Sequence, residues 1–231
     1  MPAPVSAPDG LRFFGREVHR LLVSAEMPRF EQHWRHLDST ERHRAARFRN
    51  EADCARFVIA RSSLRQLLAR RIGIASGEIR FGENEFGKPL LLHAPVTLHF
   101  NSSHSGDWVL HAIDSVAPIG IDVEAIRADL ACIDQFERVL STEELAELNA
   151  VPLQHRARSF AMVWVRKEAY VKALGEGMSR PLRGISIAVD AEGRPRLLYD
   201  RSDRESPASW QFEDLVVDAH HVACLVCRHN G

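Results

Sequence analysis

Gly120-Ile121-Asp122-Val123-Glu124 lies on a predicted β-strand, residues 119–123, that opens the second half of the chain. Side chains alternate between the two faces of a strand, so Asp122 and Glu124 leave one face while Ile121 and Val123 leave the other, toward a core. Neighbouring carboxylates repel unless a cation or a basic group lies between them. A magnesium ion would satisfy this pair, because it takes one or two protein carboxylates and fills its octahedron with water and phosphate oxygens.

The second informative stretch is Trp164-Val165-Arg166-Lys167-Glu168-Ala169-Tyr170-Val171-Lys172, inside a predicted helix over residues 156–174. Trp164, Glu168 and Lys172 are four residues apart and share one face of that helix. An acid and a base one turn apart can therefore reach the same substrate. Taken alone, the spacing favours an ordinary Glu–Lys helix pair, which stabilises a helix by about 0.2–0.5 kcal/mol.

Working outward from these stretches, the sequence pattern predicts helices followed by strands, twice over. In the first half we predict a strand at 17–23, a helix at 29–37, a helix starting at Asp38-Ser39-Thr40-Glu41 and continuing, with a break near Asn50, to Gly73, and strands at 78–81, 90–92, 97–100 and 109–113. In the second half we predict helices at 133–140, 142–149 and 156–174, and strands at 119–123, 184–189, 196–199, 210–217 and 222–227. Residues 1–10 hold three prolines and are expected to form a loose terminus.

This element order predicts an α+β fold built from two α+β halves that meet at an interface. The change of half falls near residues 115–118, which gives an N-terminal half at 1–116 and a C-terminal half at 117–231 that carries the carboxylates. Interfaces of this kind commonly hold ligands. The active site is therefore expected between the halves.

The composition is that of an ordinary globular protein. Apolar residues make up 45% and charged residues 26% of the 231 residues, which excludes disorder, collagen-like repeats and membrane spanning as explanations. The four cysteines are too sparse for a disulfide framework and fit a reducing compartment. The apolar run Leu21-Leu22-Val23 is too short for a signal peptide, so a cytoplasmic location is expected.

The charge is near neutral overall, with a net value of -1, but it is unevenly distributed. Residues 40–72 contain nine arginines against three acids. This segment indicates either an anionic partner or a solvated helix face. A nucleic-acid-binding module is a further alternative, opposed by the neutral total charge and by the lack of an aromatic and basic platform.

The segment His220-His221-Val222-Ala223-Cys224-Leu225-Val226-Cys227 offers four potential zinc ligands. Val222, Cys224 and Val226 alternate as on a strand, and thiols are among the most commonly buried side chains. A buried strand is therefore the favoured interpretation, and no zinc site is expected.

Two short segments in the first half carry groups suited to phosphate. Gly87-Lys88-Pro89 is predicted to form a turn before a short strand, with the lysine held between a permissive glycine and a restricted proline. Ser103 and His104 are predicted in the loop that follows a strand. A hydroxyl and an imidazole side by side provide a neutral and a potentially cationic donor for phosphate.

In order, Gly87-Lys88-Pro89, Asn101-Ser102-Ser103-His104, Gly120–Glu124 and Trp164–Lys172 resemble the motifs of 4'-phosphopantetheinyl transferases of the surfactin-synthetase-activating type, in the superfamily of holo-acyl-carrier-protein synthases. The resemblance spans residues 44–187. It implies two similar halves in a pseudo-twofold arrangement with the active site at their interface. It also implies an enzyme that moves the phosphopantetheine arm of coenzyme A to a serine of an apo acyl or peptidyl carrier protein, leaving 3',5'-ADP.

The same resemblance implies roles for individual residues. Asp122, Glu124 and Glu168 correspond to the ligands of Mg²⁺, with Mn²⁺ as a substitute. Glu168 corresponds also to a general base, and Lys172 to a catalytic group on the pyrophosphate. Contacts to coenzyme A are implied for Arg44, Arg61, Lys88, Ser103, His104 and Lys172, with Ser103 and His104 at the 3'-phosphate. Ser102 departs from the apolar residue that is usual at its position.

The expected partners are coenzyme A and an apo carrier protein, and we expect a monomer that binds neither nucleic acid nor membrane. The alternative that keeps the fold is a non-catalytic module that binds coenzyme A or a carrier protein. The three acidic residues oppose that alternative, because a binding module does not need a metal site. The sequence leaves open which carrier protein is modified and whether acylated coenzyme A is accepted.

Overall fold

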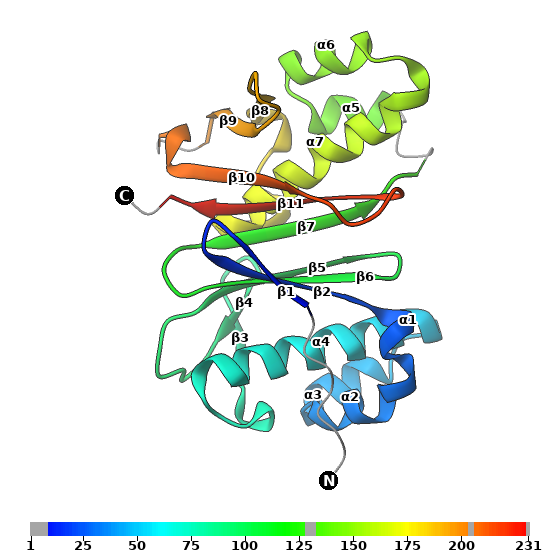
Figure 1. Ribbon diagram of the computed structural model, residues 1–231, viewed down its shortest axis with the longest axis vertical. Helices are drawn as coiled ribbons and strands as arrows, with labels where there is room; N and C mark the ends of the chain where they lie inside the picture. The colour runs from blue at the N-terminus through cyan, green and yellow to red at the C-terminus, as the bar shows by residue number, and fades with distance from the viewer. Residues whose placement is uncertain (1–8, 128–132, 203–205, 230–231) are drawn as a thin grey trace.

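The computed structural model describes residues 9–127, 133–202 and 206–229. Figure 1 shows four layers along the long axis of the molecule: helices of the first half, a first sheet, a second sheet, and helices of the second half. The two sheets face one another at the centre of the molecule, so the interface between the halves is built mainly from strands.

The first half consists of β1 (Asp9–Phe13), β2 (Arg16–Leu22), α1 (Val23–Glu26), α2 (Phe30–His36), α3 (Ser39–Ala45), α4 (Glu51–Ile72), β3 (Phe81–Glu83), β4 (Pro89–Leu91), β5 (His99–Ser105) and β6 (Trp108–Asp114). Four of its strands form an antiparallel sheet in the order β1-β2-β6-β5, and β3 and β4 form a separate hairpin. The 22-residue helix α4 packs on the outer face of this sheet.

The helix boundaries of this half follow the capping signals in the sequence. Asp38 and Glu41 form a reciprocal capping box at the start of α3. Asn50 caps α4 by accepting a hydrogen bond from the backbone N–H of Ala52, and Gly73 ends the helix at a positive φ of 77°. The predicted helix start at Asp38 and the predicted break near Asn50 are therefore confirmed.

The second half consists of β7 (Ile119–Ala125), α5 (Ile133–Val139), α6 (Thr142–Ala150), α7 (Leu153–Leu174), β8 (Ile185–Val189), β9 (Pro195–Asp200), β10 (Trp210–Leu215) and β11 (His221–Arg228). Three strands form an antiparallel sheet in the order β10-β11-β7, and β8 and β9 form a hairpin. The 22-residue helix α7 covers the outer face of this sheet, as α4 does in the first half.

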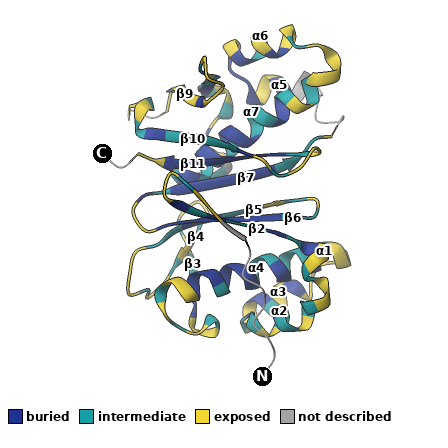
Figure 2. Cartoon of the chain, viewed as in Figure 1, coloured by how far each residue is buried: buried dark blue, intermediate teal, exposed yellow. Residues whose placement is uncertain are grey.

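The inner faces of the two sheets share a core. Ile121 and Val123 of β7 are fully buried and pack in one cluster with Leu110 of β6 and Leu225 of β11. Figure 2 shows buried residues gathered along both sheets and along the sides of α4 and α7 that face them. The predicted alternation along β7 is confirmed, since its apolar side chains enter this core while Asp122 lies toward α7, beside Lys172.

The strands β5 and β7 meet without a backbone ladder. Asn101 Oδ1, Ser103 Oγ and Ser105 Oγ accept hydrogen bonds from the backbone N–H groups of alternate β7 residues, from Ile121 to Ala125, at 2.9, 3.4 and 3.0 Å. The free edge of the second sheet is thus satisfied by side chains of the first. This contact fixes the position of β5 along β7 and therefore the position of every polar side chain on both strands.

Gly120 allows α7 to lie directly on β7. A Cβ atom at this position would lie 1.9 Å from the carbonyl oxygen of Ala169 and 2.5 Å from the backbone nitrogen of Ala173. Both contacts are with helix backbone, so no side-chain rotation relieves them. The glycine therefore sets the distance between the strand that carries Asp122 and the helix that carries Glu168 and Lys172.

The structure corrects some sequence predictions. The predicted strand at 78–81 is wrong, because a 3-10 turn at Ser76–Glu78 precedes β3, which begins at Phe81. The predicted loop at Ser103 and His104 is also wrong, since both residues lie within β5. Strand β1 and helix α1 were not predicted; residues 1–8 of the expected loose terminus lie outside the described residues.

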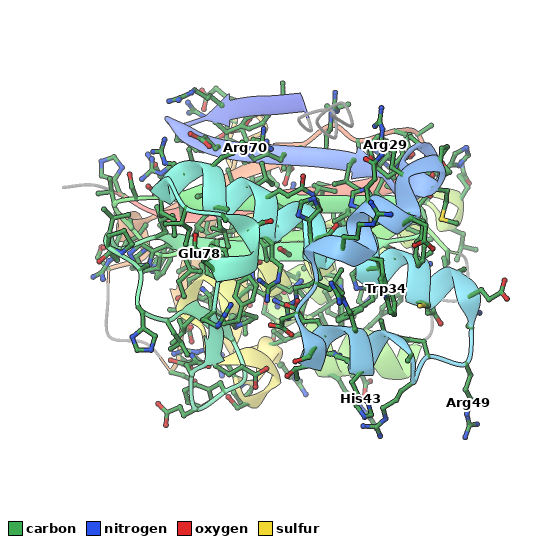
Figure 3. The ribbon with its side chains drawn as sticks, turned by 90° about the horizontal axis from the view of Figure 1, so that it is seen from below. Arg29, Trp34, His43, Arg49, Arg70 and Glu78 are labelled. Carbon is green, nitrogen blue, oxygen red and sulfur yellow. The ribbon has the colours of Figure 1, made fainter. Side chains whose placement is uncertain are left out.

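The arginines of residues 40–72 do not form one basic face. Ion pairs join Arg56 to Asp53, Arg61 to Glu41, Arg65 to Asp38 and Glu41, and Arg71 to Glu17. His43 and Arg49 instead point away from the protein, as the view from below shows (Figure 3). Much of the local positive charge is therefore neutralised within the fold.

Two other sequence interpretations concern whole elements. Cys224 and Cys227 are fully buried on β11, which confirms the strand interpretation of that segment. Within the described ranges, no helix combines the length and the apolar character needed to cross a bilayer. The division at 1–116 and 117–231 stays our proposal; the strands of the first sheet end at Asp114 and those of the second begin at Ile119.

Candidate active site

The acidic strand face and the acid–base helix face meet at the contact of β7 with α7. Lys172 Nζ on α7 lies 2.5 Å from Asp122 Oδ1 on β7. Ser103 Oγ on β5 donates to the same carboxylate oxygen at 2.7 Å and lies 3.3 Å from Lys172 Nζ. Three elements from both halves therefore converge on the Asp122 carboxylate.

Glu168 lies one helical turn before Lys172. Its Oε1 atom is buried and has no hydrogen-bond partner among the described residues. Burial raises the pKa of Glu168, Lys172 opposes the rise, and the Asp122 charge adds to it. The carboxylate thus lies in the electrostatic field of Asp122 and retains unused capacity to bind a cation or accept a proton.

Glu124 completes the acidic set at the end of β7. Its Oε1 atom accepts a hydrogen bond from Ser105 Oγ at 3.2 Å, and the side chain is half-buried. Over the part of the chain that the structure describes, no three His, Cys, Asp or Glu side chains form a ready metal cage. Magnesium does not require one, since it usually binds one or two carboxylates together with waters and substrate phosphates. The unsatisfied oxygen of Glu168 near Asp122 fits such a loosely held ion.

A cavity of about 400 Å³ lies in the first half, on the other face of β5. Helix α4 forms one wall and β5 the other, while the β3–β4 hairpin and Arg44 form the rim. The lining residues are Arg44, Phe57, Ala60, Arg61, Leu64, Glu83, Gly87, Pro89, Phe100, Asn101, Ser102 and His104. The cavity thus combines cationic side chains with aromatic rings, as a site for a nucleotide requires.

Both arginines assigned to coenzyme A line this cavity. The Arg44 guanidinium lies 5.1 Å from the centre of the Phe57 ring, and that of Arg61 lies 4.5 Å from the centre of the Phe81 ring. Burial lowers the pKa of Arg61, and the nearby Glu41 carboxylate partly compensates. Because the rings hold both guanidinium groups, their donors are oriented before a ligand arrives.

The strand β5 connects the cavity to the acidic set. Successive side chains leave opposite faces of a strand, so Ser103 contacts Asp122 while His104 lines the cavity. His104 is exposed at one side, yet desolvation of the rest of the ring lowers its pKa, with Arg56 adding to the effect. The Ser–His pair therefore serves two neighbouring parts of one site.

Lys88 does not line the cavity, in contrast to the contact expected for its side chain. Its ammonium donates to the carbonyl of Lys172 at 2.6 Å and to those of Ile119 and Ala173 at 3.3 Å. Burial lowers the pKa of Lys88 to about 8. Its neighbours Gly87 and Pro89 line the cavity instead, and Lys88 fixes their turn to the C-terminal end of α7.

Other residues of the site were not singled out from the sequence. Asn84 holds the Gly87 turn by accepting from the backbone N–H groups of Phe86 and Lys88, and it donates to the Gly175 carbonyl at 2.7 Å. Asn101 and Ser105 position β7. The alternation of polar side chains along β5 is the signal that could have revealed them.

Comparison with known proteins assigns the family. Residues 118–226 match the model of the 4'-phosphopantetheinyl transferase superfamily, and residues 24–116 match a model described as 4'-phosphopantetheinyl transferase, N-terminal. The fold and these matches thus define the class of the protein, a transferase. The chain belongs to the 4'-phosphopantetheinyl transferase superfamily.

Individual relatives match over most of their length. A 4'-phosphopantetheinyl transferase of Bacillus subtilis is 32% identical, with 79% of each chain covered. The 4'-phosphopantetheinyl transferase Sfp of Bacillus subtilis strain 168 is 30% identical, covering 85% of this chain and 84% of its own. HetI, a 4'-phosphopantetheinyl transferase of a Nostoc species, is 30% identical over 97% of this chain and 93% of its own.

His111 of β6 lies behind the cavity wall and makes stability depend on pH. Burial lowers its pKa from the ordinary value of 6.5 to about 3, with His19, Arg61 and His104 adding to the effect. Between these two values the unfolded chain binds a proton that the folded protein does not, so stability falls as pH falls. From pH 7 to pH 5 this residue alone is expected to cost about 2 kcal/mol.

The measurement is urea unfolding of the wild type and of His111→Asn at both pH values. Asparagine does not titrate, so the variant is expected to lose about 2 kcal/mol less than the wild type on acidification. The same loss in both proteins would show that His111 does not remain neutral in the folded state.

Proposed function

We propose that this chain binds coenzyme A in the cavity between α4 and β5 and transfers its phosphopantetheine arm to a serine of an apo acyl or peptidyl carrier protein. The observation that carries the proposal is that the two faces of β5 contact different parts of the site. One face lines a cavity with Arg44, Arg61 and His104, and the other bonds Asp122 through Ser103. A ligand with a nucleotide joined to a pyrophosphate could therefore extend from the cavity to the acidic centre.

The proposed roles follow from charge and position. Arg44, Arg61 and His104 would bind the phosphate of the nucleotide, while Ser103, on the other face of β5, would orient Asp122. Asp122, Glu124 and Glu168 would hold magnesium, which supplies positive charge to the pyrophosphate and to the 3',5'-ADP leaving group. Lys172 would exchange its contact with Asp122 for the pyrophosphate as the ligand enters. These groups act mainly by orienting the pyrophosphate and stabilising charge.

Glu168 is the proposed general base. It would accept the proton of the carrier serine while the serine oxygen forms a bond to the β-phosphorus of coenzyme A and the bond to the leaving 3',5'-ADP oxygen breaks. Its raised pKa and its unsatisfied oxygen support this role, because a base needs both a free lone pair and an affinity for protons.

The test is intact-mass measurement of an apo carrier protein incubated with the wild-type chain, coenzyme A and magnesium. One phosphopantetheine group is expected on the carrier, and a chelator is expected to abolish the addition until magnesium is restored. A panel of acyl and peptidyl carriers identifies the preferred one. Unchanged mass across that panel would contradict the proposal. Undiminished transfer in the presence of chelator would contradict the proposed requirement for magnesium.

The cysteines bear on the cellular location of the protein. The free thiols of Cys54, Cys224 and Cys227 support the proposal that the protein works in the reducing cytoplasm. A monomer without nucleic-acid partners stays a prediction.

A further inference from the structure

A fully buried histidine bridges the two walls of the nucleotide cavity. His111 Nδ1 lies 2.7 Å from Ser102 Oγ on β5, and His111 Nε2 lies 2.9 Å from Ser63 Oγ on α4. The imidazole itself is 0% exposed. One side chain on β6 is thus hydrogen-bonded to both elements that enclose the cavity.

Both bridged serines belong to the cavity walls. Ser102 lines the cavity directly. Ser63 is buried between Arg61 and Leu64, which line the cavity from α4. A change in the length or direction of the bridge would therefore shift one wall relative to the other. His111 therefore links the two walls from behind.

The hydrogen-bond network assigns the tautomer of the bridge. Ser63 Oγ lies 2.8 Å from the Ile59 carbonyl and 3.0 Å from the Ala60 carbonyl, and its single hydrogen is directed to these acceptors. Ser63 Oγ must then accept from His111 Nε2, so that nitrogen carries the ring hydrogen. The ring is neutral, because a pKa of about 3 lies far below physiological pH. His111 Nδ1 is consequently an acceptor.

The direction of the Ser102 hydroxyl follows. Its hydrogen is donated inward to His111 Nδ1, so the cavity meets only the lone pairs of the oxygen. A serine with a freely rotating hydroxyl could donate or accept, whereas this one can only accept. The resembled family has an apolar residue at the position of Ser102. In this chain the serine is hydrogen-bonded to the histidine behind it.

We propose that His111 is a positioning residue for coenzyme A binding, which fixes Ser102 as a hydrogen-bond acceptor toward a donor group of the bound nucleotide. This inference rests on the proposed function of the cavity. Phosphate oxygens are acceptors and suit Arg44, Arg61 and His104. The donors of the nucleotide, its base amino group and its ribose hydroxyl, require acceptors, and Ser102 and Glu83 provide them in the same cavity.

Two amide variants of His111 separate positioning from structural support. The amide of His111→Asn falls near the place of Nδ1 and retains a partner for Ser102, whereas that of His111→Gln reaches the place of Nε2 and retains only Ser63. In the Gln variant the Ser102 hydroxyl is free to rotate and is no longer held as an acceptor, so the KM for coenzyme A is expected to rise about fivefold. In the Asn variant the KM is expected to stay within about twofold of wild type.

Ser102→Ala tests the acceptor itself at a half-buried position that does not threaten folding. It is expected to raise the KM for coenzyme A about tenfold, more than His111→Gln, because no acceptor remains, and the double variant is expected to be no worse than Ser102→Ala alone. The kcat and the KM for the carrier are expected to change less than about twofold in each variant. Calorimetric titration with coenzyme A should give the same order of affinities without turnover.

The outcomes distinguish this inference from the proposed function. Wild-type transfer with equal coenzyme A affinities in all variants overturns the role of His111 alone. A loss shared by the Asn and Gln variants, or one that falls on kcat and on the KM for the carrier, shows a purely structural residue and also overturns it. A wild-type chain that neither binds coenzyme A nor modifies a carrier overturns both.

Discussion

Asp122→Asn is expected to lower kcat/KM for phosphopantetheine transfer at least about a thousandfold, since preorganised charge is the largest single contribution in such sites. The substitution keeps the size of the side chain and removes its negative charge. Lys172 then loses the carboxylate at 2.5 Å, and the proposed magnesium site loses the acid that Ser103 and Lys172 orient. Transfer is followed by the mass of the carrier over time.

The matched control is Asp190→Asn, which changes a half-buried aspartate that contacts Arg194 in the turn between β8 and β9. It is expected to retain wild-type transfer. Circular dichroism and thermal unfolding should show both variants folded. Near-normal turnover in Asp122→Asn would show that the Asp122 carboxylate has no role in the reaction, because a neutral amide cannot replace its charge.

Gly120→Ala is expected to prevent stable folding. The added Cβ would lie 1.9 Å from a carbonyl oxygen and 2.5 Å from a nitrogen of the α7 backbone, so the helix would have to move away from β7. Overpacking of a core commonly costs about 1–3 kcal/mol, and a clash with two backbone atoms of α7 is expected to exceed about 3 kcal/mol. Soluble yield and the midpoint of urea unfolding measure the loss.

Gly77→Ala is the control for this substitution. Gly77 has no atom within 4 Å of the added Cβ and does not require a positive φ, so the midpoint is expected to stay near that of the wild type. Should Gly120→Ala fold with unchanged stability, the close approach of α7 to β7 described above would be wrong. Wild-type transfer activity in Gly120→Ala would likewise contradict that close approach.

Local signals in the sequence were sufficient where one element decides the outcome. The capping residues Asp38 and Asn50 marked real helix starts, and the alternation of Ile121 and Val123 marked a strand with one face in the core. The helix spacing of Glu168 and Lys172 likewise placed both side chains beside β7. Each of these features depends on residues within a few positions of one another.

Features that depend on distant contacts were missed or misplaced. The serines and the asparagine of β5 were expected to lie in a loop, but the antiparallel ladder with β6 extends the strand to Ser105, opposite Trp108. Lys88 was expected to contact the nucleotide, because nothing near it in sequence shows that the C-terminal carbonyls of α7 lie within its reach. The bridge from His111 to Ser63 and Ser102 joins three separate elements and has no local pattern.

The contact of β5 with β7 has a consequence for dividing the chain. A fragment that starts at residue 117 would leave a row of backbone amides on β7 bare, since their acceptors belong to the first half. Bare strand edges recruit strands from other molecules. A split reporter divided between the two sheets would therefore need a soluble fusion partner that shields these β7 amides until the complementary fragment binds.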